Sequence, residues 1–180
     1  DPAEGAVNGI DRYLERTSGR VDAVFHGTTI GTNALITKKG AKTALITTKG
    51  FRDVLALRRH ARPRLYDLAP KISPELAPRE QRIEAAERMG PDGKPISPLE
   101  EAEILRLVET IQVSGAEAVA ISLLHSYAND AHERAIGEAL QSALPEVFVT
   151  LSSDVCREFR EFERTSTATV NAFIGPPVQR

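Results

Sequence analysis

The amino-acid sequence predicts an α/β fold in which helices flank a mostly parallel sheet, with a small β-hairpin as an appendage. Two observations lead to this prediction. Short, almost continuously apolar runs at residues 43–47, 117–124 and 147–151 have the character of strands that are buried on both faces. Segments with a helical spacing of apolar residues separate these runs, and such alternation is typical of parallel sheets with right-handed crossovers.

The first third of the chain predicts helices and strands in alternation. Apolar residues at helical spacing, among them Ile10 and Leu14, predict an amphipathic helix that Gly19 ends. A second helix is expected to be capped by Thr28 or Thr29 and to have Gly40 just beyond its end. The predicted elements are, in order, a helix at 3–17, a strand at 21–25, a helix up to 37, a strand at 43–47 and a short helix near 51–57.

The middle of the chain predicts a loop followed by a hairpin. Prolines at positions 63, 70, 74 and 78 interrupt any helix, so residues 60–78 are predicted to form a proline-rich loop. Residues 82–89 can form a strand, and residues 90–93 have the composition of a turn that leads to a second short strand near 94–96. We therefore expect a hairpin inserted at residues 79–97.

The second half returns to regular alternation. Ser97 and Glu100 have the spacing of a capping box, with Pro98 at the first helical position, and Gly115 is expected to end that helix. The remaining predicted elements are a strand at 117–124, a helix from 129 or 130 to the residue before Pro145, a strand at 147–151 and a last helix that begins near 155 or 158.

Composition limits the classes of protein to which the chain can belong. Its 180 residues are enough for a single domain, predicted to extend over residues 1–180. The 23 Lys and Arg nearly balance the 25 Asp and Glu, so no overall charge favours nucleic acid or a membrane surface as a partner. One cysteine, Cys156, fits a reducing compartment, and no apolar run approaches the roughly 18 residues that span a bilayer. We expect a cytoplasmic protein.

Polar residues follow the predicted strands, and the carboxyl ends of parallel strands share one edge of a sheet, where ligands bind. His26 and His125 follow the first and third of these strands. Helix capping accounts for about half of the hydroxyl and amide side chains there. It does not account for the histidines, which are either hydrogen-bonded structural residues or ligands. The polar residues are His26, Gly27, Thr28, Thr29, Thr32 and Asn33 after the first strand, and residues 47–49, 125–127 and 152–154 after the others.

The last predicted helix has an apolar stripe and a polar stripe. Phe159, Phe162, Val170 and Phe173 lie roughly along one face. The other stripe consists of Glu161, Arg164, Thr165, Ala168 and Asn171. An ordinary solvated face would look the same. The run of hydrogen-bonding side chains at 164–167 favours a functional face instead, because serine and threonine are mediocre helix formers.

No metal or nucleophile motif stands out. The four histidines show neither His-x-x-x-His nor Cys-x-x-Cys spacing, and residues 131–134 are interpreted as an exposed first turn of a helix. We interpret Cys156 as a small buried thiol rather than a reactive one. No P-loop, dinucleotide fingerprint or Gly-x-Ser-x-Gly elbow occurs, which argues against acyl-enzyme serine chemistry.

Five separated blocks stand out in the sequence: HGTTIGTNAL at 26–35, TKGFRDVL at 48–55, RPRLYDL at 62–68, LLHSYAN at 123–129 and ERTSTATVNA at 163–172. Taken together and in order, these blocks resemble the N-terminal region of the hydantoinase A family. This family includes ATP-dependent N-methylhydantoinases, 5-oxoprolinases and acetone-type carboxylases. The resemblance runs from about residue 22 to the C-terminus, and five blocks make it specific to the family without identifying the member.

The resemblance implies one lobe of an actin-like or sugar-kinase-like ATPase that acts with a hydantoinase B-like subunit or domain. Phosphorylation of a cyclic amide would make it an electrophile that water can attack, which requires ATP, Mg²⁺, donors for the phosphoryl oxygens and a base. No residue is assigned a catalytic role. The expected substrate- or phosphate-binding residues are His26, Gly27, Thr28, Thr29, Thr32, Asn33, His125, Arg164 and Thr165.

The chain departs from the family pattern at both ends. It starts at residues 1–4 without the first phosphate-loop strand of the family, and it stops near residues 175–177, where the family continues into a second ATPase lobe. We therefore expect an N-terminal domain fragment that binds neither ATP nor Mg²⁺ on its own and that self-associates as a homo-oligomer through an exposed apolar edge. A subunit fragment of an acetone-type carboxylase and a non-catalytic binding domain remain alternatives to the amidohydrolase.

Overall fold

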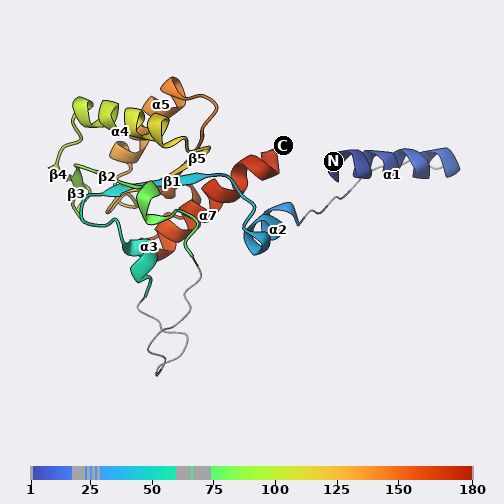
Figure 1. Cartoon of the computed structure of the whole chain (residues 1–180), viewed down its shortest axis with the longest axis horizontal. Helices are drawn as coiled ribbons and strands as arrows, with labels where there is room; N and C mark the ends of the chain where they lie inside the picture. The colour runs from blue at the N-terminus through green and yellow to red at the C-terminus, as the bar shows by residue number, and fades with distance from the viewer. Residues whose placement is uncertain are drawn as a thin grey trace.

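The structure is a computed structural model that describes residues 2–17, 23, 25, 27, 29–59, 66 and 74–179. Helices and strands alternate along these residues (Figure 1). The helices are α1 (Pro2–Arg16), α2 (Ile30–Thr37), α3 (Val54–Leu57), the 3₁₀ turn η1 (Arg79–Gln81), α4 (Glu101–Ser114), α5 (Ala131–Ala143), α6 (Ser152–Val155) and α7 (Glu161–Gln179). The strands are β1 (Thr43–Thr48), β2 (Arg82–Ala85), β3 (Arg88–Met89), β4 (Pro95–Ser97), β5 (Ala118–Ser122) and β6 (Phe148–Leu151).

The core of the described chain is a four-stranded parallel sheet in the order β2-β1-β5-β6. In the centre, Thr43 of β1 pairs with Ala118 of β5, and every residue of both strands is buried. The continuous apolar runs of these strands therefore reflect coverage of both sheet faces, as the sequence predicted. The parallel sheet flanked by helices is confirmed.

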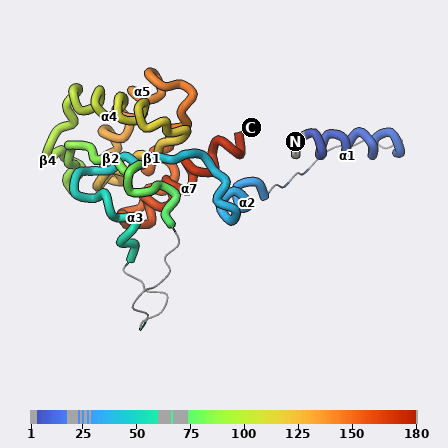
Figure 2. The backbone as a smooth tube through the Cα atoms, in the orientation of Figure 1, coloured from blue at the N-terminus to red at the C-terminus, as the bar shows by residue number. Residues whose placement is uncertain are grey.

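The two faces of the sheet are covered by different helices. Helices α4 and α5 lie on one face and α7 lies on the other, as the path of the chain in Figure 2 shows. Successive strand residues point to opposite faces, so Ile46 and Ile121 pack under α4 and α5, whereas Leu45 and Ala120 pack under α7. The helical part of the first cluster includes Leu107, Ile111, Ile136 and Leu140, and that of the second includes Ala168 and Ala172.

The predicted hairpin at 79–97 is wrong in its first strand. Strand β2 pairs in parallel with β1, with Leu45 opposite Arg82, and so forms the edge of the main sheet. Ile83 and Ala85 are buried in the core cluster beneath α4 and α5. The antiparallel hairpin comprises only β3 and β4, joined by the turn expected at residues 90–93. A strand of four residues does not reveal its partner, because the pairing strand β1 lies far away in sequence.

Two helix boundaries also differ from the prediction. Helix α4 begins at Glu101, and Ser97 belongs to β4, so the capping box does not form. Glu103 instead accepts a hydrogen bond from the amide of Ala86 at 2.7 Å, which joins the first turn of α4 to the end of β2. At the end of α2 the left-handed residue is Lys38, with φ 54°, and not Gly40.

Gly40 is needed for a different reason. A Cβ atom at this position would overlap the ring of Phe173 in α7. The neighbouring amide of Ala41 donates a hydrogen bond to the carbonyl of Phe173 at 3.0 Å. The backbone before β1 therefore passes directly against α7, and only glycine fits there.

Several predicted segments differ in extent or lie outside the described residues. The predicted strand at 21–25 is represented only by Ala23 and Phe25, which have no regular structure, and Phe25 is 97% exposed. Of the predicted loop at 60–78, residues 66 and 74–78 are described and contain no helix or strand. The short helix near 51–57 is confirmed as α3, and the last helix proves to be two, α6 and α7. No helix in the described part of the chain has the length and apolar character needed to cross a membrane.

Candidate functional site

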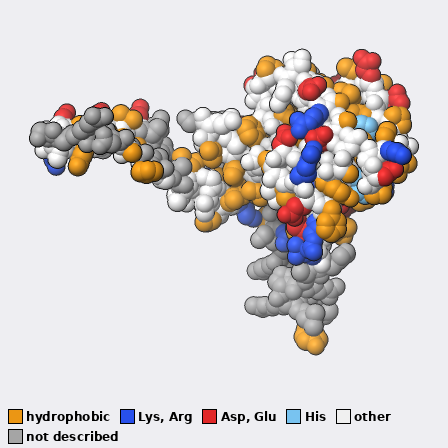
Figure 3. Space-filling view, turned by 180° about the vertical axis from the view of Figure 1, so that it is seen from behind, with side chains coloured by type: hydrophobic (Ala, Val, Ile, Leu, Met, Phe, Trp, Pro, Cys, Tyr) orange, Lys and Arg blue, Asp and Glu red, His pale blue; other side chains and the backbone are white. Residues whose placement is uncertain are grey.

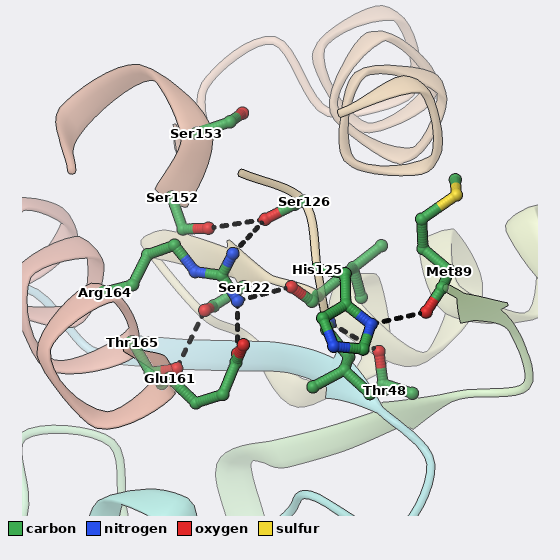
Figure 4. Close-up of polar contacts among 12 residues, drawn as sticks. Thr48, Met89, Ser122, His125, Ser126, Ser152, Ser153, Glu161, Arg164 and Thr165 are labelled. Carbon is green, nitrogen blue, oxygen red and sulfur yellow. Dashed lines mark hydrogen bonds and ion pairs between the residues drawn. The ribbon is translucent and has the colours of Figure 1, made fainter. Parts of the chain in front are cut away.

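A network of buried polar side chains lies at the carboxyl ends of β1, β5 and β6. Figure 4 shows part of it, with side chains from the loop after β5, from α6 and from the start of α7 converging. The loop at residues 123–126 lies at its centre and is held at every residue by a hydrogen bond from another element. Parallel strands bring their carboxyl ends to one edge, so this is the edge at which an α/β sheet binds ligands.

Arg164 is the central cation of the network, and none of its side chain is exposed. Its guanidinium donates to the Ser126 hydroxyl and to the Leu123 carbonyl, both at 2.8 Å, and forms an ion pair with Glu161 (Figure 4). The same group lies 5.7 Å from the centre of the Tyr127 ring. A buried guanidinium is costly unless its donors are paired. The two terminal nitrogens of Arg164 have partners and join α7 to the loop after β5, whereas its buried Nε has no hydrogen-bond partner among the described residues.

The polar stripe of α7 is the face that packs on the sheet. Thr165 is buried and its hydroxyl lies 2.8 Å from that of Ser122 in β5. Ala168 and Ala172 are also fully buried, whereas Phe159 is 68% exposed. The alternative of an ordinary solvated face is therefore excluded for the buried residues of this stripe, Arg164, Thr165 and Ala168. Small residues on α7 face the small residues Ala118 and Ala120 of β5, so the helix packs against the sheet through its small and polar residues.

Glu133 is a second fully buried charged group at this edge. Its carboxylate accepts hydrogen bonds from the amides of Leu123 and Ser153 at 2.9 and 3.0 Å, and from the hydroxyl of Ser152 at 2.6 Å. Three neutral donors thus satisfy the carboxylate and connect α5 to the ends of β5 and β6. The sequence interpretation of residues 131–134 as an exposed turn is wrong for Glu133, whose burial the local sequence does not signal.

His125 adopts a backbone conformation that is uncommon for a residue with a side chain, with φ 57°. Its Nδ1 atom lies 2.8 Å from the Met89 carbonyl (Figure 4). A carbonyl can only accept, so Nδ1 carries a proton and the lone pair of the neutral ring is on Nε2. The ring contacts that of Tyr127 edge-on, at 6.0 Å between centres. His125 therefore attaches the β3–β4 hairpin to the edge of the sheet.

Burial raises the pKa of Glu161 above the ordinary value for a glutamate, while Arg164 and His125 act in the opposite direction. About a quarter of its side chain is exposed, so this carboxyl group lies where the buried network meets the surface. A carboxyl with a raised pKa at the rim of a buried polar cluster has the properties of a proton donor or acceptor.

A hydrogen-bonded cluster of Thr48, Glu87 and His132 joins β1, the β2–β3 connection and α5. Thr48 donates its hydroxyl proton to Glu87, and the other oxygen of Glu87 lies 2.7 Å from Nδ1 of His132. The Thr48 hydroxyl also accepts a hydrogen bond from the amide of Leu124 at 2.9 Å. Neither Glu87 nor His132 was predicted from the sequence to be a site residue. The one signal in the sequence was the position of Glu87, which follows the strand that pairs with β1.

The predicted site residues fall into two groups. His125, Arg164 and Thr165 meet at the carboxyl edge, as expected. Thr29, Thr32 and Asn33 are exposed on and before α2, and Gly27 is exposed as well. At Gly31 a side chain would touch Ile174 and Val178, so α2 packs near the far end of α7, roughly 15 Å along the helix from Arg164. His26 and Thr28 lie outside the described residues.

The residues around α2 can donate hydrogen bonds to an anion. The side-chain amide of Asn33 lies 3.2 Å from the Thr29 hydroxyl, and the Thr29 side chain does not cap the helix. Hydroxyl and amide groups beside a helix N-terminus are suited to phosphoryl oxygens. Within the described ranges, no group of three or more His, Cys, Asp or Glu residues could hold a metal ion.

Comparison with known proteins gives one matching family, described as the hydantoinase/oxoprolinase N-terminal region, over residues 1–144. An uncharacterised protein of Methanocaldococcus jannaschii is 38% identical over 98% of the chain. The caprolactamase α subunit of Pseudomonas jessenii is 37% identical over 88% of it. A 5-oxoprolinase of Arabidopsis thaliana is 30% identical over 98% of it. The chain spans 26%, 23% and 16%, respectively, of the lengths of these relatives.

Two solved structures share the fold. The crystal structure of the ATP-dependent caprolactamase from Pseudomonas jessenii matches 96% of the chain with a TM-score of 0.84 and 34% identity. The nucleotide-free structure of acetone carboxylase matches 83% of the chain with a TM-score of 0.75 and 25% identity. The chain covers 26% and 23% of these structures.

Proposed function

The chain belongs to the hydantoinase/oxoprolinase family as its N-terminal region, and on this premise we propose that it is one lobe of an ATP-dependent enzyme that opens a cyclic amide. The observation that carries this proposal is the match to the ATP-dependent caprolactamase over 96% of the chain. That enzyme, by its name, acts on a lactam, and the 5-oxoprolinase relatives, by theirs, also act on a cyclic amide.

The polar groups of the chain fit parts of this chemistry. ATP would supply the phosphoryl group that activates the amide oxygen. Thr29, Thr32 and Asn33 are exposed donors beside the start of α2 and would bind phosphoryl oxygens. The described residues contain no cluster of carboxylates for Mg²⁺, so the metal would be held by ATP and by another part of the enzyme.

The edge built around Arg164 would serve as a rigid wall for the substrate. Arg164, Ser126 and Glu133 connect α7, the loop after β5 and α5 through buried hydrogen bonds. Such a wall holds surface groups such as His125 and Glu161 in a fixed position and excludes water from beneath them. We assign no reaction step to the buried groups themselves.

The experiment that tests this function uses the complete enzyme, assembled with a hydantoinase B-like partner. Phosphate release from ATP is measured with caprolactam, hydantoin, N-methylhydantoin or 5-oxoproline, each against a blank without amide. We expect ATP turnover that depends on one of these rings and yields the opened product. Turnover that ignores every ring and yields no opened product would contradict the proposal.

A matched pair of variants tests the role of the residues around α2. Thr32 in α2 and Thr167 in α7 are both exposed helical threonines. We expect Thr32→Ala to raise the KM for ATP about tenfold, and Thr167→Ala to leave it unchanged. A phosphoryl oxygen that loses one hydrogen bond loses about 1–1.5 kcal/mol of binding energy, which corresponds to this factor. Equal KM values for the two variants would remove Thr32 from the site.

A carboxylase subunit is the second candidate function. The match to acetone carboxylase and the 28% identity to an acetophenone carboxylase subunit of Aromatoleum aromaticum favour it. ATP turnover that requires bicarbonate and a ketone, rather than a cyclic amide, would establish this alternative. Absence of any turnover in the complete enzyme would leave a non-catalytic binding domain. For the isolated chain we predict no tight binding of Mg-ATP in calorimetry.

A further inference from the structure

Glu87 and His132 form a buried carboxylate–imidazole pair that the proposed function has not used. The Glu87 side chain is fully buried in the connection between β2 and β3. His132 lies in the first turn of α5, and its side chain is 14% exposed. The pair is therefore fully buried at its carboxylate end and partly exposed at its imidazole end.

The directions of the hydrogen bonds around Glu87 are fixed. The amide of Leu124 donates to the oxygen of the Thr48 hydroxyl, so the single proton of that hydroxyl is free to be donated to Glu87. One carboxylate oxygen thus accepts from Thr48, and the other lies 2.7 Å from His132 Nδ1. The ring nitrogen that faces the carboxylate carries a proton, and the neutral ring has its lone pair on Nε2.

The ring edge with Nε2 is the one directed away from the buried carboxylate. Figure 3 shows histidine surface on the face seen from behind. His125 and His132 are the two histidines within the described residues, and both are partly exposed. Nε2 of His132 has no hydrogen-bond partner among the described residues. A basic ring nitrogen without a partner, on a ring that is held by its opposite edge and partly exposed, is arranged as a proton acceptor.

Glu133 provides an internal comparison. It is another buried carboxylate at the same sheet edge, and it is satisfied by two amides and a hydroxyl without any ionisable partner. Burial of a glutamate at this edge thus does not require a histidine. The imidazole on Glu87 supplies a property that amides and hydroxyls lack, namely a second ring nitrogen with a basic lone pair.

We propose that His132 is the general base of the ring-opening reaction and that Glu87 is the residue that positions it. This inference rests on the proposed function. One O–H bond of the attacking water breaks and its proton moves to Nε2. The water oxygen bonds to the activated amide carbon, and the C=N electron pair moves to the ring nitrogen. That nitrogen then takes the proton from Nε2. In the next step Nε2 passes the proton of the new hydroxyl group to the same nitrogen while the C–N bond breaks, which leaves an amine and an acyl phosphate. A second water hydrolyses the acyl phosphate to a carboxylate and free phosphate.

The first test concerns the chain itself and does not depend on turnover. Long-range ¹H–¹⁵N NMR of the histidine rings reports which nitrogen is protonated. We expect the Nδ1–H tautomer for the neutral His132 ring, together with modification of Nε2 by diethyl pyrocarbonate. The Nε2–H tautomer, or a ring that does not react, would overturn the proposal even if the enzyme opens cyclic amides.

The second test separates a base from a structural contact in the complete enzyme. His132→Gln retains a hydrogen-bond donor toward Glu87 but has no base. We expect its kcat for ring opening to fall about 100-fold or more, with KM changed less than about threefold. We also expect free imidazole to restore part of the kcat of His132→Ala. Activity of His132→Gln within about threefold of wild type would show that the contact is only structural.

Glu138→Gln is the matched control, because Glu138 is exposed on the same helix and is expected to retain wild-type kcat. Absence of amide-dependent turnover in the wild-type enzyme would contradict the proposed function, whereas the NMR result would still decide the arrangement of the pair. The two failures are therefore distinguishable.

Discussion

At the scale of single residues, Arg164 shows how one buried charge organises several elements. Its guanidinium joins α7 to the carbonyl of Leu123, the hydroxyl of Ser126 and the carboxylate of Glu161. Glu133 and Thr48 hold the amides of this loop, at Leu123 and Leu124, whereas Arg164 pairs with its Leu123 carbonyl and its Ser126 hydroxyl. Removal of Arg164 would leave a carbonyl and a carboxylate without their partner.

We predict that Arg164→Met lowers the free energy of unfolding by about 3–5 kcal/mol, the range found when one member of a buried pair is removed. Urea denaturation measures this change. Arg160 precedes Arg164 by one helical turn and is exposed, so Arg160→Met is the control, with an expected change within about 0.5 kcal/mol. Similar losses in both variants would contradict the assigned role of Arg164.

The sequence predicted part of this residue-level picture. His125 was expected at the shared edge of the sheet because it follows a strand, and the family resemblance implied Arg164 and Thr165 at the same site. The three residues do meet at this edge. Glu87 and Glu133 were not predicted. Glutamate is common on exposed surfaces, and only the pairing of β2 with β1 and the orientation of α5 bury these two side chains.

At the scale of elements, the structure depends on how closely α7 approaches the sheet and α2. Glycine at position 40 and alanines at positions 118, 120, 168 and 172 remove side-chain volume along this helix. At Gly175 a Cβ atom would overlap the ring of Phe148 in β6. The small residues therefore set the distance between the helix and its neighbours.

Gly40→Ala is predicted to destabilise the protein by about 1–3 kcal/mol, because the added methyl group overlaps the Phe173 ring. Thermal or urea unfolding measures the loss. Gly31→Ala is the matched control at the other end of α2, where the methyl group meets Ile174 and Val178 at ordinary contact distance. It should be neutral or stabilise by up to about 1 kcal/mol. Stabilisation by both substitutions would contradict the close approach of α7.

The contact between α4 and β2 gives a prediction for pH. The hydrogen bond from the Arg106 guanidinium lowers the pKa of Glu103 below the ordinary value for a glutamate. Burial of the carboxyl acts in the opposite direction, and the hydrogen bond from the Ala86 amide lowers the pKa further. Because the carboxylate is favoured in the folded state, its contribution is present above the ordinary glutamate pKa and is lost as the pH falls through the lowered one. Wild-type stability should therefore decline below about pH 5.

We expect Glu103→Gln to lower the free energy of unfolding at pH 7 by about 1–2 kcal/mol, and the difference from wild type to shrink toward pH 3. Urea denaturation at pH 7, 5, 4 and 3 measures the difference. Glu101→Gln is a suitable control, since Glu101 is exposed in the same turn. A difference that stays constant with pH would show that the Glu103–Arg106 pair is not the cause.

Elements were predicted where the local sequence determines them. Continuous apolar runs located β1, β5 and β6, and Gly115, with φ 62°, ends α4 as expected. The prediction errors concern which segments pair with one another, and not where the strands lie in the sequence. The strand at 82–85 joined the main sheet instead of the hairpin because its pairing with β1 is a long-range contact. The apparent capping box failed because Ser97 pairs with Arg88 in the hairpin.

At the scale of the whole molecule, the described residues divide into a buried sheet with its helices and the separate helix α1. Every described side chain of α1 is exposed or only partly buried. An isolated helix of this length is marginal in water, because tertiary packing supplies most helical stability. The amphipathic pattern that predicted α1 therefore gives the helix an apolar face that packs against no other element within the described residues.

Hydrogen exchange should reveal this difference. We expect the amides of β1 and β5 to exchange slowest, through global unfolding, and those of α1 to exchange close to the rate of an unfolded peptide. NMR or mass spectrometry measures both rates. Strong protection of α1 that rises with protein concentration would show that the helix packs in a homo-oligomer. Protection that does not change with concentration would contradict the exposed position of α1.

The position of α7 in the chain has a consequence for synthesis. Helix α7 covers one face of the sheet, yet it follows all four strands in sequence. While the ribosome makes the chain, Leu45, Ala118 and Ala120 have no cover until residues 161–179 have emerged. The central pairing of β1 with β5 also joins segments about 75 residues apart, which slows folding. Nascent chains that stop before α7 should therefore bind chaperones, and completion of α7 should release them.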